Sequence, residues 1–193
     1  MICLFSIQAW AQSGKLFNTD NQLSSNLATQ VFQDKSGFIW IATRNGLNTY
    51  DGYHITVIKK DMSNFLGLNS NYINCIAQDH KEHILLGTNN SLLEFTGSEF
   101  RKIPMLDSKG EELATYVKQI YPLRNKDVAV ATSGYGIMLK KQDEQKCYAM
   151  KGEVEKLKYI HKLLEDKRGR LWIITEDGKL YRKETNGRVT SHF

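Results

Sequence analysis

Carboxylates at expected turns are the side chains of this sequence that could carry out hydrolysis. A glycoside hydrolase needs two carboxylates that converge on one bond, and no spacing in the sequence brings two together. The chain also has no glycine-rich phosphate loop, no Gly-x-Ser-x-Gly motif and no convincing Cys/His pair. We therefore predict a protein without catalysis of its own. The turn carboxylates in question are Asp51, Asp79, Asp127 and Asp177.

Histidines and cysteines give the sequence its candidate metal ligands. His80 and His83 lie three residues apart in an expected turn and could share a metal ion. A protein metal site needs at least a third ligand, and the sequence places none beside them. Exposed turn histidines are common, so we predict neither a metal site nor a cofactor. A disulfide between Cys75 and Cys147 would be chemically feasible, but the interpretation we favour is two buried free thiols.

The formal net charge of +5 and the isoelectric point near 9.0 raise the question of an anionic partner. Lysine and arginine are dense after Lys140, but acidic residues are interspersed with them, which is typical of solvated strand faces. No block of like charge or interleaved aromatic platform occurs, so we do not expect nucleic-acid binding. A basic patch that receives an anionic sugar remains an open alternative. No run of 18 apolar residues is present, so no mature element is expected to span a membrane.

An internal repeat organises the chain that carries these residues. Gln33 and Asp34 return as Gln78 and Asp79, an offset of 45 residues, and Trp40 returns as Trp172, three steps of 44 residues later. A period of 40 to 50 residues with about four short β-patterned runs is the signature of propeller blades. Each four-stranded sheet buries its faces only against its neighbours. We therefore predict an all-β chain: a partial β-propeller of about four blades, each with four antiparallel strands.

The recurring residues have expected structural roles. The tryptophans lie in the second strand of their units, where a large ring would fill the gap between adjacent sheets. The aspartates would cap the first hairpin turn through their side-chain oxygens, and the glycines that end these turns require positive φ. The residues that mark the repeat are Asp34, Gly37, Trp40, Gly46, Asp79, Asp166, Gly169, Trp172 and Gly178.

The expected domain organisation is a short leader followed by the propeller segment. Residues 1–11 contain an apolar run and a small-x-small motif, Ala9-Trp10-Ala11, and are interpreted as the remnant of a secretory signal peptide. Residues 12–193 form the propeller segment, with blades at about 23–58, 68–104, 113–150 and 158–193. Lys15-Leu16-Phe17 would be an orphan N-terminal strand, the outermost strand of a further blade. The arithmetic of four blades plus one strand indicates a truncated chain or a fragment of a larger ring.

Two stretches conflict locally with this interpretation. Leu113, Val117 and Ile120 fall at helical spacing, and so do the apolar residues from Val154 to Leu164. The phase of the repeat instead places both stretches at first-strand positions, and we predict strands there.

The motifs of these units resemble the two-component regulator propeller repeat. The shared pattern is a Leu-Ser-Ser-Asn entry (23–26), a Gln-Asp turn, a Gly-aromatic-aliphatic-Trp run, a Thr-x-x-Gly-Leu segment and an aromatic-Asp-Gly exit. The chain departs from it at Ala42, where glycine is usual, and at Leu85 and Ser91, which replace the tryptophan and a glycine in the second unit. The resemblance implies the periplasmic sensor region of a hybrid two-component histidine kinase, whose parent protein is anchored in the inner membrane. It also implies a phosphorelay, carbohydrate signals, and other blades or sensor domains of the parent as partners.

A ligand would bind on the face that carries the entry loops and the loops between second and third strands. Amides, an arginine and a tyrosine on that face suit the hydroxyl groups of a glycan or oligosaccharide. The recurring asparagines, Asn26, Asn45 and Asn71, could equally cap turns. Two alternatives to a sensor stay open: a glycan-active propeller enzyme, such as a lyase or a sialidase-like hydrolase, and a purely structural interaction scaffold. The candidate ligand-binding residues are Arg44, Asn45, Asn89, Asn90, Tyr135 and Glu176.

Overall fold

The computed structural model describes residues 16–60 and 67–192, and these form four β-sheets. Each sheet contains an antiparallel meander of four consecutive strands, which we call a blade. Blade one contains β1 (Ala28–Gln33), β2 (Ile39–Thr43), β3 (Gly46–Tyr50) and β4 (Ile55–Ile58). Blade two contains β5 (Ile73–Gln78), β6 (Ile84–Thr88), β7 (Leu92–Phe95) and β8 (Phe100–Ile103). Blade three contains β10 (Val117–Pro122), β11 (Val128–Thr132), β12 (Ile137–Lys140) and β13 (Cys147–Ala149). Blade four contains β14 (Ile160–Glu165), β15 (Leu171–Thr175), β16 (Leu180–Lys183) and β17 (Val189–Ser191).

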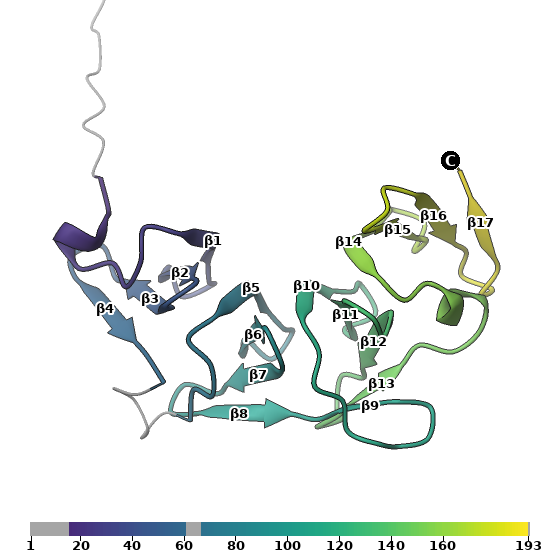
Figure 1. Ribbon diagram of the computed structural model, residues 1–193, viewed down its shortest axis with the longest axis horizontal. Coiled ribbons are helices and arrows are strands. Elements are labelled where there is room, and N and C mark those ends of the chain that lie inside the picture. Colours follow the sequence, from purple (N-terminus) through teal and green to yellow (C-terminus); the bar gives the residue numbers. More distant parts are fainter. Residues whose placement is uncertain (1–15, 61–66, 193) are drawn as a thin grey trace, which may run out of the picture.

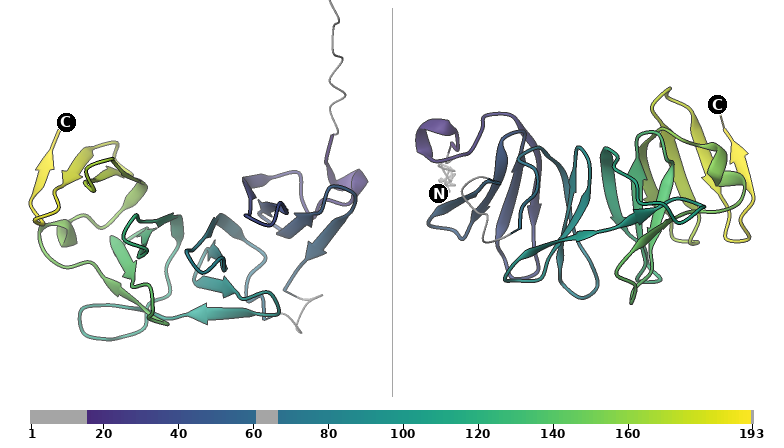
Figure 2. Two further views of the ribbon diagram at one scale, coloured as in Figure 1. Left: turned by 180° about the vertical axis from the view of Figure 1, so that it is seen from behind. Right: turned by 60° about the horizontal axis from the view of Figure 1, so that its bottom comes forward.

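The four blades stand side by side along an arc, as Figure 1 shows. The first strand of each blade, β1, β5, β10 and β14, lies on the concave side of the arc, and the later strands lie toward its rim (Figures 1 and 2). The predicted all-β partial propeller of four blades is therefore confirmed.

The hairpin turns follow the chemistry that the repeat predicts. Asp34 Oδ1 accepts a hydrogen bond from the Phe38 backbone N–H (3.0 Å), and its Oδ2 accepts one from the Trp40 indole (2.7 Å). Asp166 does the same for Arg170 N–H (3.1 Å) and for the Trp172 indole (3.1 Å). One aspartate thereby satisfies both the turn and the ring that follows it. The turn glycines have positive φ, from 74° to 127°, at Gly37, Gly46, Gly169 and Gly178.

A threonine closes the turn between the second and third strands of every blade. Its Oγ1 lies within hydrogen-bond distance of a main-chain carbonyl oxygen across the turn, at 2.7–3.1 Å, and all four threonines are buried. These threonines are Thr43, Thr88, Thr132 and Thr175.

Apolar clusters fill the three boundaries between neighbouring blades. At the boundary of blades one and two, Trp40 is 6% exposed and packs edge-on against Phe95, with ring centroids 5.7 Å apart. At the next boundary, Leu85 and Val130 are fully buried, and at the third, Ile160 and Ile173 are. Each sheet is thus kept dry by its neighbour, which is the reason a single blade would not be stable alone.

Glutamine side chains add a polar contact between blades. Gln30 of β1 accepts a hydrogen bond from Ile76 N–H (3.0 Å) and donates one to Ile76 O (2.9 Å) on β5. Gln119 of β10 makes the same pair of bonds with Leu163 of β14, at 2.7 and 3.2 Å. Each side-chain amide therefore satisfies the backbone N–H and C=O of one residue in the next blade, as a neighbouring strand would. We call this arrangement the glutamine clasp.

The structure differs from the sequence-based expectation at the blade edges. The segment after β8 forms an unpredicted strand, β9 (Met105–Leu106), which pairs parallel with β13 and makes the third sheet five-stranded. The orphan strand expected at 15–17 is wrong for its described part, because Leu16 and Phe17 belong to no strand. Phe17 instead packs on Tyr50, with ring centroids 4.9 Å apart.

The two stretches with helical spacing are resolved mainly in favour of strands. Val117 and Ile120 lie in β10, as the phase of the repeat predicts. In the second stretch, Ile160–Glu165 is β14, but Glu153–Lys156 forms one turn of 3-10 helix, η2, that precedes the strand. Val154 of this turn is 1% exposed and packs in the apolar cluster of blades three and four. The helical spacing at the start of this stretch therefore corresponds to the short turn η2. A second short 3-10 turn, η1 (Thr19–Asn21), precedes blade one.

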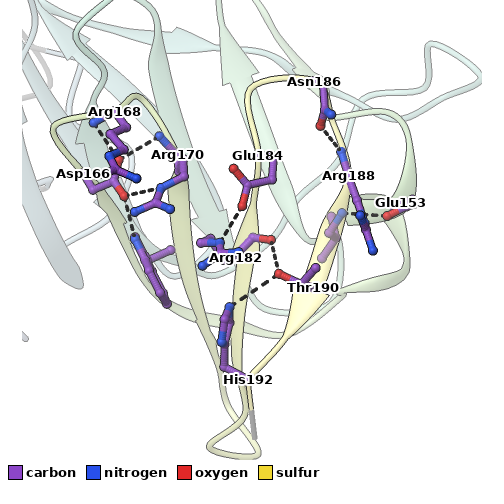
Figure 3. A network of polar contacts seen from close by, with 12 residues as sticks. Glu153, Asp166, Arg168, Arg170, Arg182, Glu184, Asn186, Arg188, Thr190 and His192 are labelled. Atoms are coloured by element: carbon purple, nitrogen blue, oxygen red, sulfur yellow. Dashed lines mark hydrogen bonds and ion pairs between the residues drawn. The ribbon is translucent and has the colours of Figure 1, made fainter.

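The gap-filling role expected for Trp172 stays a prediction. Its ring is only half-buried and no neighbouring sheet covers it there; the guanidinium carbons of Arg170 and Arg182 lie 5.9 and 5.5 Å from its centroid. These two arginines are held by ion pairs with Asp166 (2.7 Å) and Glu184 (2.6 Å), which Figure 3 shows along the face of blade four. Cation–π contacts take the place of the sheet packing that Trp40 has.

Two further expectations concern the cysteines and the leader. Cys75 and Cys147 are buried free thiols, as predicted, and burial raises the pKa of each to about 12. The expected signal-peptide remnant, residues 1–11, lies outside the described residues. In the ranges 16–60 and 67–192, no helix has the length and apolar character needed to cross a membrane.

Candidate functional site

The concave side of the arc gathers side chains from the first strands of all four blades. The residue that precedes each first strand is Leu27, Tyr72, Tyr116 or Tyr159, and the second residue within each strand is Thr29, Asn74, Lys118 or His161. Because the blades repeat every 43 to 45 residues, the same positions line up along the inner surface. Figure 1 shows the strands that carry them, β1, β5, β10 and β14, facing one another across the opening of the arc.

All of these residues except Tyr159 line a cavity of about 430 Å³. All four blades contribute to its wall, and Arg44 reaches it from the loop between β2 and β3. We call this region the inner cavity. Its lining consists of Leu27, Ala28, Thr29, Arg44, Tyr72, Asn74, Tyr116, Lys118, His161 and Lys162.

Cations and tyrosines alternate along the wall. The Arg44 guanidinium lies 5.6 Å from the centroid of Tyr72, and Lys118 Nζ lies 4.7 Å from that of Tyr116. The two tyrosine rings contact each other edge-on, with centroids 6.2 Å apart and planes at 65°. The wall therefore combines apolar ring surface with positive charge, a composition that suits ligands with both a ring face and an anionic group.

The charges that line the inner cavity favour a negatively charged ligand. Arg44, Lys118 and Lys162 are cationic, while the lining contains no carboxylate. Glu176 lies beside the wall and pairs with Lys118 at 3.1 Å. Partial burial acts to raise the pKa of Glu176, but hydrogen bonds from Lys118 and Ser133 outweigh it and lower that pKa below its usual value. Glu176 is therefore ionised at neutral pH and offsets one of the three charges.

Tyr116 remains protonated at neutral pH. Burial raises the pKa of Tyr116 to about 12, and its hydrogen bond with Tyr72 acts in the same direction. Asn74 donates to Val117 O (3.1 Å), while its own carbonyl oxygen is buried without a hydrogen-bond partner among the described residues. The wall thus offers phenolic hydroxyls and amide groups, which can both donate and accept hydrogen bonds.

The structure separates the predicted ligand residues into three groups. Arg44 lines the inner cavity, and Glu176 holds the lining residue Lys118. Tyr135 is 43% exposed and lines a different, smaller cavity of about 160 Å³ together with Asp107.

The predicted asparagines serve the turns. Asn45 Nδ2 donates to Ser24 O (3.4 Å), Asn90 Oδ1 accepts from Thr88 Oγ1 (3.0 Å), and Asn89 Oδ1 accepts from Ser70 Oγ (2.9 Å). These bonds are the turn-capping alternative that the repeat itself indicates. None of these three asparagines lines the inner cavity.

Sequence reasoning missed Tyr72, Tyr116, Lys118, His161 and Lys162. Tyrosine recurs in phase before the first strand of blades two, three and four, so the signal was present in the repeat. The predicted ligand residues lie in the loops, whereas the wall of the inner cavity is formed where each loop enters its first strand.

The structure also brings three possible metal ligands together away from the inner cavity. His83 Nδ1 lies 3.2 Å from Glu94 Oε1 and 3.8 Å from Asp79 Oδ2. His80, which the sequence paired with His83, points elsewhere, with its Nε2 2.9 Å from Leu123 O of blade three. The two histidines therefore do not share a site. We call Asp79, His83 and Glu94 the blade-two cluster.

Comparison with known families identifies the repeat. Three segments, residues 22–45, 67–90 and 156–177, match the family model of the two component regulator propeller. They cover the entry loop and the first two strands of blades one, two and four. No curated protein matches the sequence.

Solved structures with the same fold include extracellular domains described as parts of two component systems, and an enzyme. The extracellular domain of BT4673, described as part of a hybrid two component system from B. thetaiotaomicron, is 18% identical, with a TM-score of 0.74 over 87% of this chain and 25% of that one. The extracellular domain of BT3049, a hybrid two component system of the same organism, is 16% identical, with a TM-score of 0.55 over 92% of this chain and 31% of that one. Virginiamycin B lyase from Staphylococcus aureus is 13% identical, with a TM-score of 0.66 over 85% of this chain and 54% of that one. At these identities the likeness establishes a propeller fold, and the chain spans about a quarter of the length of the BT4673 domain.

Proposed function

Because the chain carries two component regulator propeller repeats, we propose that it is the sensor segment of a bacterial two-component signal transduction protein. In this proposal the segment binds a carbohydrate signal in the inner cavity, and other blades or sensor domains of the parent protein complete the response. The kinase and phosphorelay steps belong to the parent. The segment itself has no catalytic role.

The observation that carries the proposal is the composition of the inner cavity. Tyr72 and Tyr116 offer ring faces on which the apolar side of a sugar can stack. Arg44, Lys118 and Lys162 surround them with positive charge that Glu176 offsets only in part. An oligosaccharide with carboxylate or sulfate groups combines the two features that this wall can recognise.

The proposed location is the periplasm, with the parent protein anchored in the inner membrane. Two considerations support this proposal: the structures of BT4673 and BT3049 are described as extracellular domains, and residues 1–11 have the pattern of a signal-peptide remnant.

A glycan-active enzyme is the less favoured alternative. Virginiamycin B lyase shares the fold, but hydrolysis by the two-carboxylate route needs two acidic groups that flank one bond. The described lining of the inner cavity contains no carboxylate, and the adjacent Glu176 is engaged with Lys118. A purely structural scaffold, the third alternative, predicts no ligand at all.

Titration calorimetry of the purified chain against neutral, uronic-acid and sulfated oligosaccharides tests the proposal. We expect binding by a charged oligosaccharide that weakens as salt is raised, because screening reduces the attraction. Arg44→Gln and Tyr72→Leu should each weaken it at least tenfold, about 1.4 kcal/mol. Leucine is the matched replacement because Leu27 holds the same position in blade one.

The control is Tyr148→Leu, which removes an exposed tyrosine from β13, outside the inner cavity. It should leave affinity unchanged. Flat titrations across the panel would favour the structural scaffold, and turnover of an oligosaccharide by the purified chain would favour the enzyme.

A further inference from the structure

The blade-two cluster lies at the β5–β6 turn of blade two. The inner cavity lies at the opposite end of β5, where the entry loop meets the strand. Asp79 begins the turn between β5 and β6, His83 ends it, and Glu94 projects from the neighbouring strand β7. Glu94 pairs with Leu85, two residues after His83, so the hairpin brings the carboxylate back to the histidine. The sheet register therefore fixes all three side chains on a rigid frame.

The separations of the donor atoms fit a small divalent metal ion. One nitrogen and two carboxylate oxygens, one from each residue, lie within 4.8 Å of one another. His83 Nδ1 is 3.2 Å from Glu94 Oε1 and 3.8 Å from Asp79 Oδ2. Ligands of a tetrahedral zinc ion at about 2.0–2.1 Å from the metal are separated by roughly 3.3 Å. The two separations from His83 Nδ1, 3.2 and 3.8 Å, are close to that value, and the two carboxylate oxygens, within 4.8 Å of each other, would draw together around the ion.

Neighbouring groups orient the carboxylates for this task. Asp79 Oδ1 accepts the backbone N–H groups of Lys81 (2.8 Å) and His83 (2.9 Å), which turns Oδ2 toward the histidine ring. Glu94 is 4% exposed, and Lys140, itself 2% exposed, places its ammonium 3.9 Å from Glu94 Oε1. That distance is too long for a hydrogen bond, so the lone pairs of Glu94 stay available to a metal ion, with which the nearby ammonium competes. The backbone hydrogen bonds to Asp79 are outer contacts of the kind that orient metal ligands.

A path to solvent exists on one side of the cluster. His83 lines a cavity of about 620 Å³ at the boundary of blades one and two. Asp79 and Glu94 are buried, whereas the His83 side chain is 32% exposed. A metal ion held by the three side chains would therefore keep its fourth position on the histidine side, where water or a ligand can occupy it.

We propose that Asp79, His83 and Glu94 form a binding site for a divalent transition metal, with zinc as the ion that best fits the ligands. Imidazole nitrogen excludes calcium and magnesium as preferred occupants, because both prefer all-oxygen ligands. The two carboxylates balance the charge of the ion. Binding would fix the β5–β6 turn to β7 and stabilise blade two, independently of the proposed carbohydrate site.

Calorimetric titration of the tag-free, metal-stripped chain with zinc chloride tests the proposal, with cobalt as a spectroscopic substitute. We expect one strong zinc site and, with cobalt, visible absorption bands of a four-coordinate complex. Zinc should also raise the melting temperature of the chain. His83→Gln should weaken zinc binding at least tenfold and abolish the rise in melting temperature, because loss of outer contacts alone costs metal sites 10- to 100-fold.

His80→Gln is the matched control, since it removes the other histidine of the same turn and should leave the strong site intact. A second variant, Lys140→Met, removes the competing ammonium and should be rescued by zinc, as judged from its melting temperature. The proposal is overturned if the wild-type chain binds no zinc. Equal zinc affinities in the wild-type and His83→Gln chains would likewise assign the binding to other surface groups.

Discussion

Replacing the clasp residue Gln30 by leucine tests how much the blades gain from polar contacts between them. The side chain makes two hydrogen bonds to Ile76, at 2.9 and 3.0 Å, and Ile76 itself is 2% exposed. Each bond contributes about 1 kcal/mol net, and a buried main-chain group left without a partner costs about 1–3 kcal/mol. Water that reaches the edge of the clasp would hydrogen-bond the freed Ile76 main-chain groups and reduce this cost. We therefore expect Gln30→Leu to lower the free energy of unfolding by about 2–3 kcal/mol.

Urea denaturation followed by tryptophan fluorescence measures this change. With a slope of about 2 kcal/mol per molar urea, the midpoint should fall by roughly 1–1.5 M. Gln33→Leu is the control, because Gln33 is exposed and bonds only within its own turn, to Gly37 O at 3.4 Å. It should change stability by less than about 0.5 kcal/mol.

The clasp between blades three and four offers an independent repeat of the experiment. Gln119→Leu should cost a similar amount, and the double variant should lose the sum, since the two clasps share no partner. If Gln30→Leu were as stable as Gln33→Leu, the apolar clusters alone would hold the blades together and the reasoning would be wrong.

Three further predictions address the core, the thiols and the carboxylates. Gly87→Ala should destabilise the chain by about 1–3 kcal/mol in the same denaturation assay, because the added Cβ would lie 2.5 Å from Val117 Cγ1 of the next blade. Cys75 and Cys147, whose pKa values burial raises to about 12, should react with iodoacetamide at pH 8 only as fast as the chain unfolds, which peptide mapping would show; rapid labelling of either would contradict their burial. Hydrogen bonds from Lys179 and Thr175 lower the pKa of Asp177 to about 2, so its stabilising contribution is present above its ordinary pKa of 3.8 and is lost as the pH falls toward 2. Melting temperatures from pH 5 to pH 2 should therefore fall more steeply for the wild-type chain than for Asp177→Asn, and parallel curves would refute this.

The blade architecture could be predicted from the sequence because it depends on local chemistry that recurs. The turn aspartates, the closing threonines and the alternation of buried residues repeat with the same spacing, and the strands follow them. Strand β9 could not be predicted, because its formation depends on β13, some forty residues later, and on a parallel pairing that leaves no periodic trace. The surroundings of Trp172 were also beyond the repeat, since its position in the blade does not say whether another sheet lies against it.

The candidate sites were less predictable than the fold. Arg44 was singled out because it breaks the repeat, and it does line the inner cavity. Tyr72 and Tyr116 follow the repeat and were therefore passed over, although their side chains meet only when the blades are side by side. His83 was paired with His80 by sequence distance, whereas the hairpin joins it to Glu94, eleven residues away. In both cases the missing information was which residues the sheet places opposite each other.

Strand β9 has a mechanical consequence for the chain. It links the last strand of blade two to the outer edge of blade three, and Met105 is 1% exposed in that position. No residue of β16 or β17 in blade four is equally inaccessible. Amide hydrogens of the two middle blades should thus exchange with solvent last and in concert, while those of the outer strands of blade four should exchange early, so that the arc comes apart from this end and keeps its centre longest.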